Sequence, residues 1–232
     1  MLSLVSMIIY FAILMILPLW AQHKVKSTYE KYSQVRSTSG KTGREVAEEI
    51  LHANGINDVE VLEGEGFLSD HYDPSKKVIR LSAANYNRPS VAGTAIAAHE
   101  VGHAIQDAQG YFYLRFRHAL FPLANIGSSL SYILIMAGIV LTSMQMAIGS
   151  TALWIGIFLM AFAVLFSIIT LPVEFDASKR AMNNIKDLNI VNDKEYKHAR
   201  KVLSAAAMTY VASTAVAVAE LLRFILIARS SD

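Results

Sequence analysis

The chain begins with a long apolar stretch, and three further apolar stretches follow a polar region. Leu2 to Trp20 has about nineteen residues without a charge, which at about 1.5 Å per residue cross most of a roughly 30 Å hydrocarbon layer. The stretch lacks the basic start and small-residue cleavage site of a signal peptide, so we predict a retained membrane anchor. Leu130 to Met144 and Ala147 to Leu171 predict two more spans joined by a tight hairpin. Val202 to Ile227 either spans the membrane or lies partly buried.

The polar region from Gln22 to about Ala108 carries both helical and strand patterns. Apolar positions at helical spacing predict an amphipathic helix over Lys41 to Ala53, which Gly55 would end. Val59 to Leu62 and Val78 to Ser82 alternate apolar and polar residues. The turn sequence Asp73-Pro74-Ser75 lies between them, so these two segments are expected to pair as a β-hairpin.

A second helix is expected after the break at Asn87-Arg88-Pro89. Ser90 is a plausible N-cap, the helix would run to about Ala108, and Gly110 lies beyond its end. The patterns as a whole therefore predict a mainly α fold, in which a multi-span helical membrane bundle carries a small α+β domain.

Composition and charge support a membrane protein and exclude several other classes. The chain is 53% hydrophobic, and its 21 basic residues nearly balance 19 acidic ones, so no nucleic-acid partner is expected. Because cysteine is absent, any zinc must be held by imidazole and carboxylate groups.

Basic residues follow the first and the third predicted spans, and such residues mark the cytoplasmic side. They include Lys24, Lys26, Lys31, Lys179, Arg180 and Lys186. We therefore expect an integral protein of the plasma membrane whose polar regions, and any active site in them, face the cytoplasm, with the hairpin near Gly149 outside.

His99-Glu100-Val101-Gly102-His103 is a zincin motif within the second predicted helix. Residues four apart lie one helical turn apart, so His99 and His103 can face one metal ion. Glu100 lies about 100° round the same helix, where it can act as the general base toward a metal-bound water.

A catalytic zinc needs a third protein ligand. The extended zincin pattern fails, because Gln106 and Gln109 stand where it requires Gly and His. His118 is one alternative, although an anchoring role at the membrane interface also explains it. Glu174 is better placed, at the cytoplasmic end of the third span, although it could also be a solvated helix cap after Pro172.

The chain resembles the YugP-like family of membrane neutral zinc metallopeptidases, of the gluzincin type, over nearly its whole length. The matching stretches are Thr42 to Val46, Leu68 to Pro74, Val78 to Ser82, Ala97 to Gln106 and Pro172 to Ser178. The resemblance implies an integral-membrane zinc peptidase. Its more distant relatives place an Asp four residues after the ligand Glu, where this chain has Ser178, and Asp176 is a poor replacement on a regular helix.

Other residues have both functional and structural interpretations. The cluster Asp70-His71-Tyr72-Asp73 either contacts substrate or forms a hydrogen-bonded turn. Val78 to Ser82 would serve as an edge strand for an extended peptide or as a core strand. His198, Arg200 and Tyr210 follow Glu174 and could donate to an oxyanion, but nothing in their spacing selects one, and a structural role explains each of them better.

These features predict a membrane-embedded, Zn²⁺-dependent endopeptidase with Glu100 as catalytic base and His99, His103 and Glu174 as metal ligands. Its partners would be a peptide or membrane-protein substrate and the lipid bilayer. A non-catalytic zinc-binding scaffold or quality-control adaptor, and less readily a small transporter, are the alternatives. The predicted segments are the anchor (1–21), the zincin-like domain (22–118), the two-span hairpin (119–172) and the third-ligand segment with the C-terminal helix (173–232).

Overall fold

The computed structural model describes residues 4–66 and 69–231, so Leu2 and Leu68 of the stretches above lie outside the described residues. The chain divides into two compact units. The first contains Met1–Tyr111 and Val173–Thr209, and the second contains Phe112–Pro172 and Tyr210–Asp232. This contact-based division groups the chain differently from the four segments expected along the sequence, because two long helices each contribute to both units.

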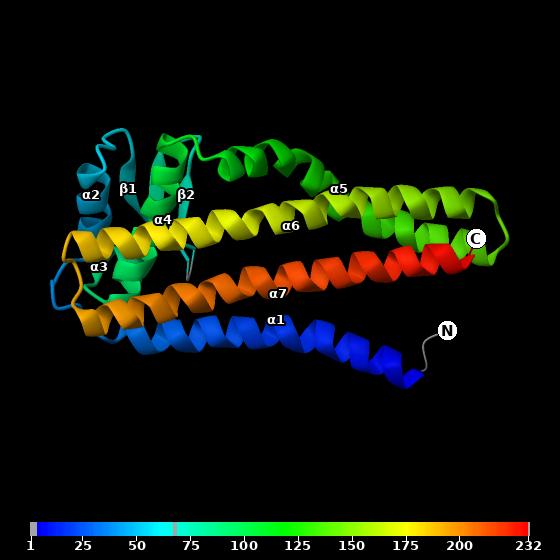
Figure 1. Ribbon diagram of the computed structural model, residues 1–232, viewed down its shortest axis with the longest axis horizontal. Coiled ribbons are helices and arrows are strands. Elements are labelled where there is room, and N and C mark those ends of the chain that lie inside the picture. The colour runs from blue at the N-terminus through cyan, green and yellow to red at the C-terminus, as the bar shows by residue number, and fades with distance from the viewer. Residues whose placement is uncertain (1–3, 67–68, 232) are drawn as a thin grey trace. The chain divides into compact units, whose positions relative to one another are not determined.

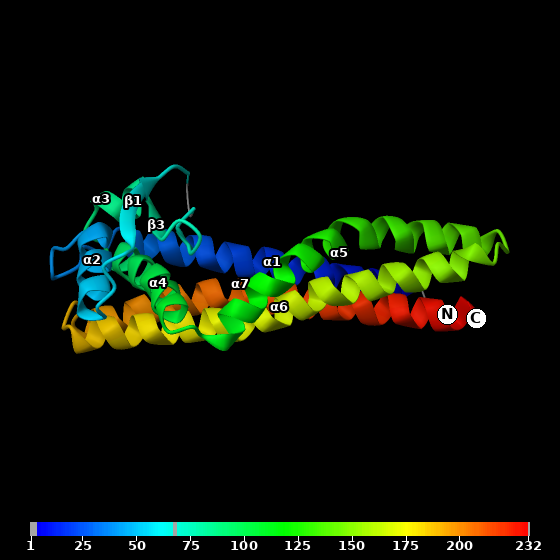
Figure 2. The same ribbon diagram turned by 90° about the horizontal axis from the view of Figure 1, so that it is seen from above.

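The first unit contains the small sheet and the helices around it. Its first helix, α1 (Leu4–Ser33), extends the predicted anchor well into the polar region. Next come α2 (Gly43–Ala53), the strands β1 (Glu60–Gly64), β2 (His71–Asp73) and β3 (Val78–Ser82), then α3 (Ala83–Asn87) and α4 (Val91–Ala108). Helices α2 and α4 lie together beside the strands (Figures 1 and 2). The predicted helices are confirmed at both positions.

Local side-chain bonds define the starts of these helices. The Thr42 side chain accepts from the Glu45 amide, and the Glu45 carboxylate accepts from the Thr42 amide, which forms a capping box at α2. Ser90 caps α4 in the expected way, accepting from the Gly93 amide at 3.0 Å. Glu195, at the start of α7 (Asp193–Ser231), accepts two 2.7 Å hydrogen bonds from Thr38. These bonds attach the loop before α2 to a distant part of the chain.

The predicted pairing of the strands was wrong. The sheet order is β1-β3-β2, with β1 parallel to β3 and only β2 antiparallel to it. The Asp73 carboxylate accepts from the amides of Ser75 and Lys76, so the expected turn joins β2, rather than β1, to β3. Strand β3 is therefore central and largely buried, and the interpretation of Val78 to Ser82 as an edge strand was also wrong.

The second unit is entirely helical among the residues described. It contains α5 (Phe112–Ser143), the first part of α6 (Ile148–Asp187) and the last part of α7 (Asp193–Ser231). Helices α5 and the start of α6 run side by side from the hairpin that joins them (Figure 2). Helix α5 begins 18 residues before the predicted span, since the aromatic and basic residues after Tyr111 continue the same helix through Pro122.

Within the described ranges, four helices are long and apolar enough to cross a membrane, namely α1, α5, α6 and α7. The mainly helical fold with a small sheet is thereby confirmed. Helix α7 contains the apolar stretch from Val202 to Ile227, for which both spanning and partial burial were considered. The two charged residues of this stretch pair with each other, with the Arg223 guanidinium 2.6 Å from Glu220.

Candidate metal centre

Helix α4 brings the two motif histidines onto one face. Alanines fill most of its turns, and Ala95, Ala97, Ala98 and Ala104 are all buried. The rings of His99 and His103 lie one turn apart, with centroids 4.8 Å from each other and planes at 81°. The small side chains allow neighbouring elements to approach the helix closely.

Helix α6 approaches α4 closely at Gly102. A Cβ atom at this position would lie 2.5 Å from the Ala177 carbonyl oxygen, so only glycine fits. Glu174 is one turn before Ala177 on the same helix. Close contact between the two helices therefore carries the Glu174 carboxylate to the histidines from a position 71 residues after His103.

The three side chains form a compact and nearly dry cluster. Glu174 Oε2 lies 3.3 Å from His99 Nε2 and 3.6 Å from His103 Nε2, and the Glu174 side chain is only 4% exposed. All three ligand atoms lie within 4.8 Å of one another. Among the described residues, this group of possible ligands contains Glu174 and does not contain His118, which lies on α5.

The separations of the Glu174 oxygen from the two histidine nitrogens are close to those around a zinc ion. Zinc bonds to imidazole nitrogen and carboxylate oxygen are about 2.0 to 2.2 Å long, so two ligands of a tetrahedral ion lie about 3.3 to 3.5 Å apart. The distances from Glu174 to both histidines agree with this separation. Two imidazoles and one carboxylate could therefore hold zinc and leave a fourth position open.

Each histidine has an outer partner on the ring nitrogen that faces away from Glu174. Nδ1 of His99 lies 3.2 Å from Ser178 Oγ, and Nδ1 of His103 lies 3.1 Å from Gln106 Oε1. Because the Gln106 oxygen can only accept, the proton of His103 lies on Nδ1 and the Nε2 lone pair faces Glu174. Such partners can orient histidines that bind a metal, and Ser178 lies against His99 at the position, four residues after Glu174, where the resemblance led us to look for Asp.

Asp176 supports the site indirectly. The amide nitrogen of Gln106 donates at 2.8 Å to both the Val173 carbonyl oxygen and Asp176 Oδ2, which also assigns the orientation of the amide. The Arg180 guanidinium in turn bonds Asp176 and donates to Gln109 at 2.6 Å. Asp176 therefore holds Gln106 rather than a histidine, in agreement with its unfavourable position round the helix.

Glu100 is buried beside the three possible ligands. It is 8% exposed, and burial raises the pKa of its carboxyl to about 7. The charges of Glu174 and Asp70 also raise this pKa, whereas His99 and a hydrogen bond from the Tyr72 backbone lower it. A carboxyl group with this exposure is costly to keep in a protein interior without a function for it.

The cluster from Asp70 to Asp73 is largely structural. Asp70 accepts bonds from the Ser82 amide and from Asn85, and Tyr72 donates to Asp107 at 2.8 Å. Burial, together with the Asp107 carboxylate, raises the pKa of Tyr72, and the hydrogen bond to Asp107 raises the pKa of Lys77. The backbone of Tyr72, on the edge strand β2, forms a hydrogen bond with Glu100 of the zincin motif.

The proposed oxyanion donors on α7 have other contacts. His198 stacks on Tyr32 of α1 with ring centroids 4.7 Å apart, and Arg200 lines a groove between α1 and α7. Tyr210 belongs to the second unit. Sequence reasoning missed Gln106, Gly102 and Asn85, although glutamine at a buried helical position three residues after His103 is a detectable signal.

Comparison with known proteins agrees with this geometry. The family model described as "Putative neutral zinc metallopeptidase" matches residues 7–229. The chain is 46% identical over 211 residues to the "Putative membrane protease YugP" of Bacillus subtilis (strain 168), which covers 91% of each chain. No solved structure matches the chain significantly. Because the family model covers almost the whole sequence, the chain belongs to the "Putative neutral zinc metallopeptidase" family.

Proposed function

We propose that the chain is a membrane-embedded, zinc-dependent endopeptidase, with His99, His103 and Glu174 as metal ligands and Glu100 as general base. The observation that carries the proposal is the buried Glu100 carboxyl, adjacent in sequence to a ligand set that leaves one position open. A purely structural zinc site is normally closed by four ligands and needs no buried base, so a non-catalytic scaffold explains this arrangement less well.

Zinc in this ligand set would act as a Lewis acid that polarises a peptide carbonyl and acidifies a water molecule. Glu100 accepts the proton of the attacking water and delivers it to the leaving amine. Ser178 and Gln106 keep the imidazole rings oriented. We place the extended substrate along β2, the edge strand whose Tyr72 backbone contacts Glu100.

The decisive experiment compares Glu100→Gln with wild type in detergent, measuring zinc content and casein cleavage in the same samples. We expect Glu100→Gln to keep zinc and to lose at least about 100-fold of the cleavage rate. Glu63→Gln, which changes an exposed acid on β1, is the matched control and should leave both values unchanged. Full cleavage by Glu100→Gln contradicts this mechanism. Zinc-loaded wild type without any cleavage favours the scaffold.

We also propose a location in the plasma membrane with the metal centre on the cytoplasmic side, because basic residues follow the apolar parts of α1 and α6. Since the chain has no cysteine, single substitutions can report orientation cleanly. A thiol reagent that does not cross membranes should label Met146→Cys in intact cells and should label Lys76→Cys only after lysis. The reverse pattern contradicts the orientation.

A further inference from the structure

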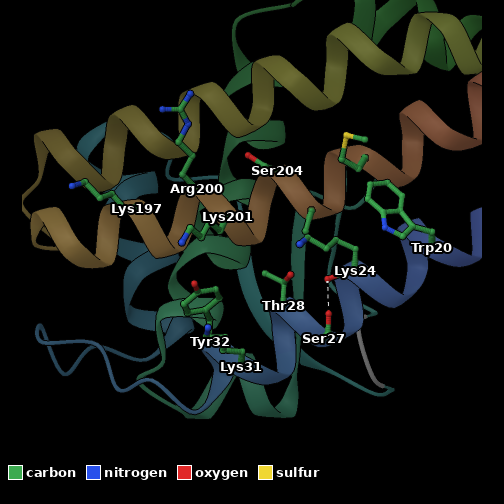
Figure 3. Close-up of a pocket in the computed structure, with 12 residues that line it drawn as sticks. Trp20, Lys24, Ser27, Thr28, Lys31, Tyr32, Lys197, Arg200, Lys201 and Ser204 are labelled. Carbon is green, nitrogen blue, oxygen red and sulfur yellow. Dashed lines mark hydrogen bonds between the residues drawn. The ribbon is translucent and has the colours of Figure 1, made fainter. Parts of the chain in front are cut away.

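A groove of about 820 Å³ lies between α1 and α7 in the first unit, separate from the metal centre. Figure 3 shows its walls, where Lys24 and Lys201 extend into the space between the two helices. Tyr32, which lines the groove, is buried, and its ring lies against that of His198. The two helices are therefore in contact beside the groove. The groove is therefore a feature of a packed interface.

All the charged side chains that line the groove are basic. Five of its twelve lining residues are cationic, and none is acidic: Lys24, Lys31, Lys197, Arg200 and Lys201. Among the residues that the structure describes, no ion pair joins any of these five to a carboxylate. Because no acidic residue lines the groove, the positive potential of these cations favours an anion bound there.

The other end of the groove is apolar. Trp20, Ala205 and Met208 line it, and Trp20 is 48% exposed. Trp20 ends the apolar stretch of α1, on which Ile13, Ile16 and Leu19 are each more than half exposed. A tryptophan between an apolar helix and a basic segment is typical of the boundary between acyl chains and lipid headgroups.

We propose that this groove binds the headgroup of an anionic phospholipid, with its phosphate among the five cations and an acyl chain along the apolar part of α1. Charge alone would also accept a free phosphate, but a free phosphate does not explain the adjoining apolar wall. Basic clusters immediately beside a membrane span attract anionic lipids in the cytoplasmic leaflet, which agrees with the proposed orientation. The lipid site does not depend on peptidase activity.

Trp20 provides a direct readout, because the chain has only two tryptophans and Trp154→Phe leaves Trp20 as the single tryptophan, which can be excited selectively. This full-length variant is reconstituted in phosphatidylcholine vesicles that contain a minor fraction of brominated phosphatidylglycerol or, in a parallel sample, brominated phosphatidylcholine. We expect the phosphatidylglycerol probe to quench Trp20 about three-fold more than the phosphatidylcholine probe. Equal quenching by the two lipids overturns the proposal without any further variant.

The charge variant combines Lys24→Gln, Arg200→Gln and Lys201→Gln. Its control removes the same charge from exposed positions outside the groove, with Lys26→Gln, Lys186→Gln and Lys194→Gln. We expect the groove variant to lower the relative affinity for phosphatidylglycerol about tenfold and the control to lower it less than about twofold. Equal losses would mean that general surface charge attracts the lipid, which overturns a specific site.

Two further measurements complete the test. Unchanged zinc content and melting temperature show that the groove variant is folded, and Lys201→Gln alone replaces it if it is not. Inorganic phosphate is added at matched ionic strength. If it abolishes the preference for phosphatidylglycerol, the groove is a site for free phosphate and the lipid assignment is wrong.

Discussion

The two compact units bury different chemistry. The first buries Glu100, Glu174, Glu195, Gln106 and Asn85, and hydrogen bonds connect most of these to distant parts of the chain. The second is held by apolar contacts around Ile135, Leu153, Ile157, Met160 and Phe224. Its glycines allow close helix contact, since a Cβ atom at Gly138 would lie 2.5 Å from the Leu153 backbone nitrogen.

This contrast agrees with the proposed membrane location, because water and lipid favour different ways of holding helices together. Where lipid surrounds helices, apolar contacts gain little over lipid, and close packing at small residues takes their place. Where water surrounds a domain, burial of apolar side chains supplies stability, and directional bonds can then place a metal site within tenths of an ångström. If this comparison holds, zinc binding depends on the packing of the first unit and not on that of the second.

Removing the third proposed ligand should have the largest effect. We expect Glu174→Ala to weaken zinc binding by more than about 100-fold, because loss of an outer partner alone costs about 10- to 100-fold. Glu220→Ala removes a buried acid of the second unit that pairs with Arg223, and it should leave zinc affinity unchanged. Competition with a chromogenic chelator measures both. Equal losses would mean that Glu174 has no special role.

Filling the glycine contacts should separate stability from metal binding. Gly102→Val places atoms against the Ala177 carbonyl, and Gly138→Val places them against Leu153, so each should cost about 3 kcal/mol of stability. Only Gly102→Val should also reduce zinc content, because it separates α6 from α4. Melting curves in detergent and zinc analysis provide the two readouts, and zinc loss from Gly138→Val would contradict the comparison.

Loss of one outer partner should have a moderate effect. Ser178→Ala is expected to lower zinc affinity about tenfold, since His99 loses the partner that orients its ring. Ser178→Asp should retain the affinity, because a carboxylate accepts the same proton. Ser167→Ala changes another serine of α6, whose hydroxyl donates to the Ala163 carbonyl, and it should have no effect. A tenfold loss in the Ser167 variant would argue against the role of Ser178.

The smallest effect should come from the helix cap of α2. Thr42→Ala removes the bond to the Glu45 amide and should cost about 1 kcal/mol, which lowers the melting temperature by about 2 to 4 °C in a chain of this length. Zinc affinity should not change, because α2 supplies no metal ligand. A loss of zinc in this variant would show that the first unit responds to local damage as a whole.

Much of the site could be predicted because its signals are local. The spacing of His99 and His103 on one helix, and the position of Glu100 between them, follow directly from helical geometry. Helices over 43–53 and 91–108 were found through their periodicity and caps. The hairpin prediction failed since alternation identifies a strand without identifying its partner, and three-residue β2 was too short to detect.

The sequence by itself determined the long apolar stretches, the zincin motif and the absence of thiol chemistry, because each depends on composition or on neighbours along one helix. Only the tertiary structure decided that Glu174 rather than His118 joins the histidines, that Ser178 and Gln106 support their rings, and that α1 and α7 enclose a basic groove. Each of these depends on segments far apart in the chain. Packing at Gly102 and between α1 and α7 brings them together, and no local pattern records such contacts.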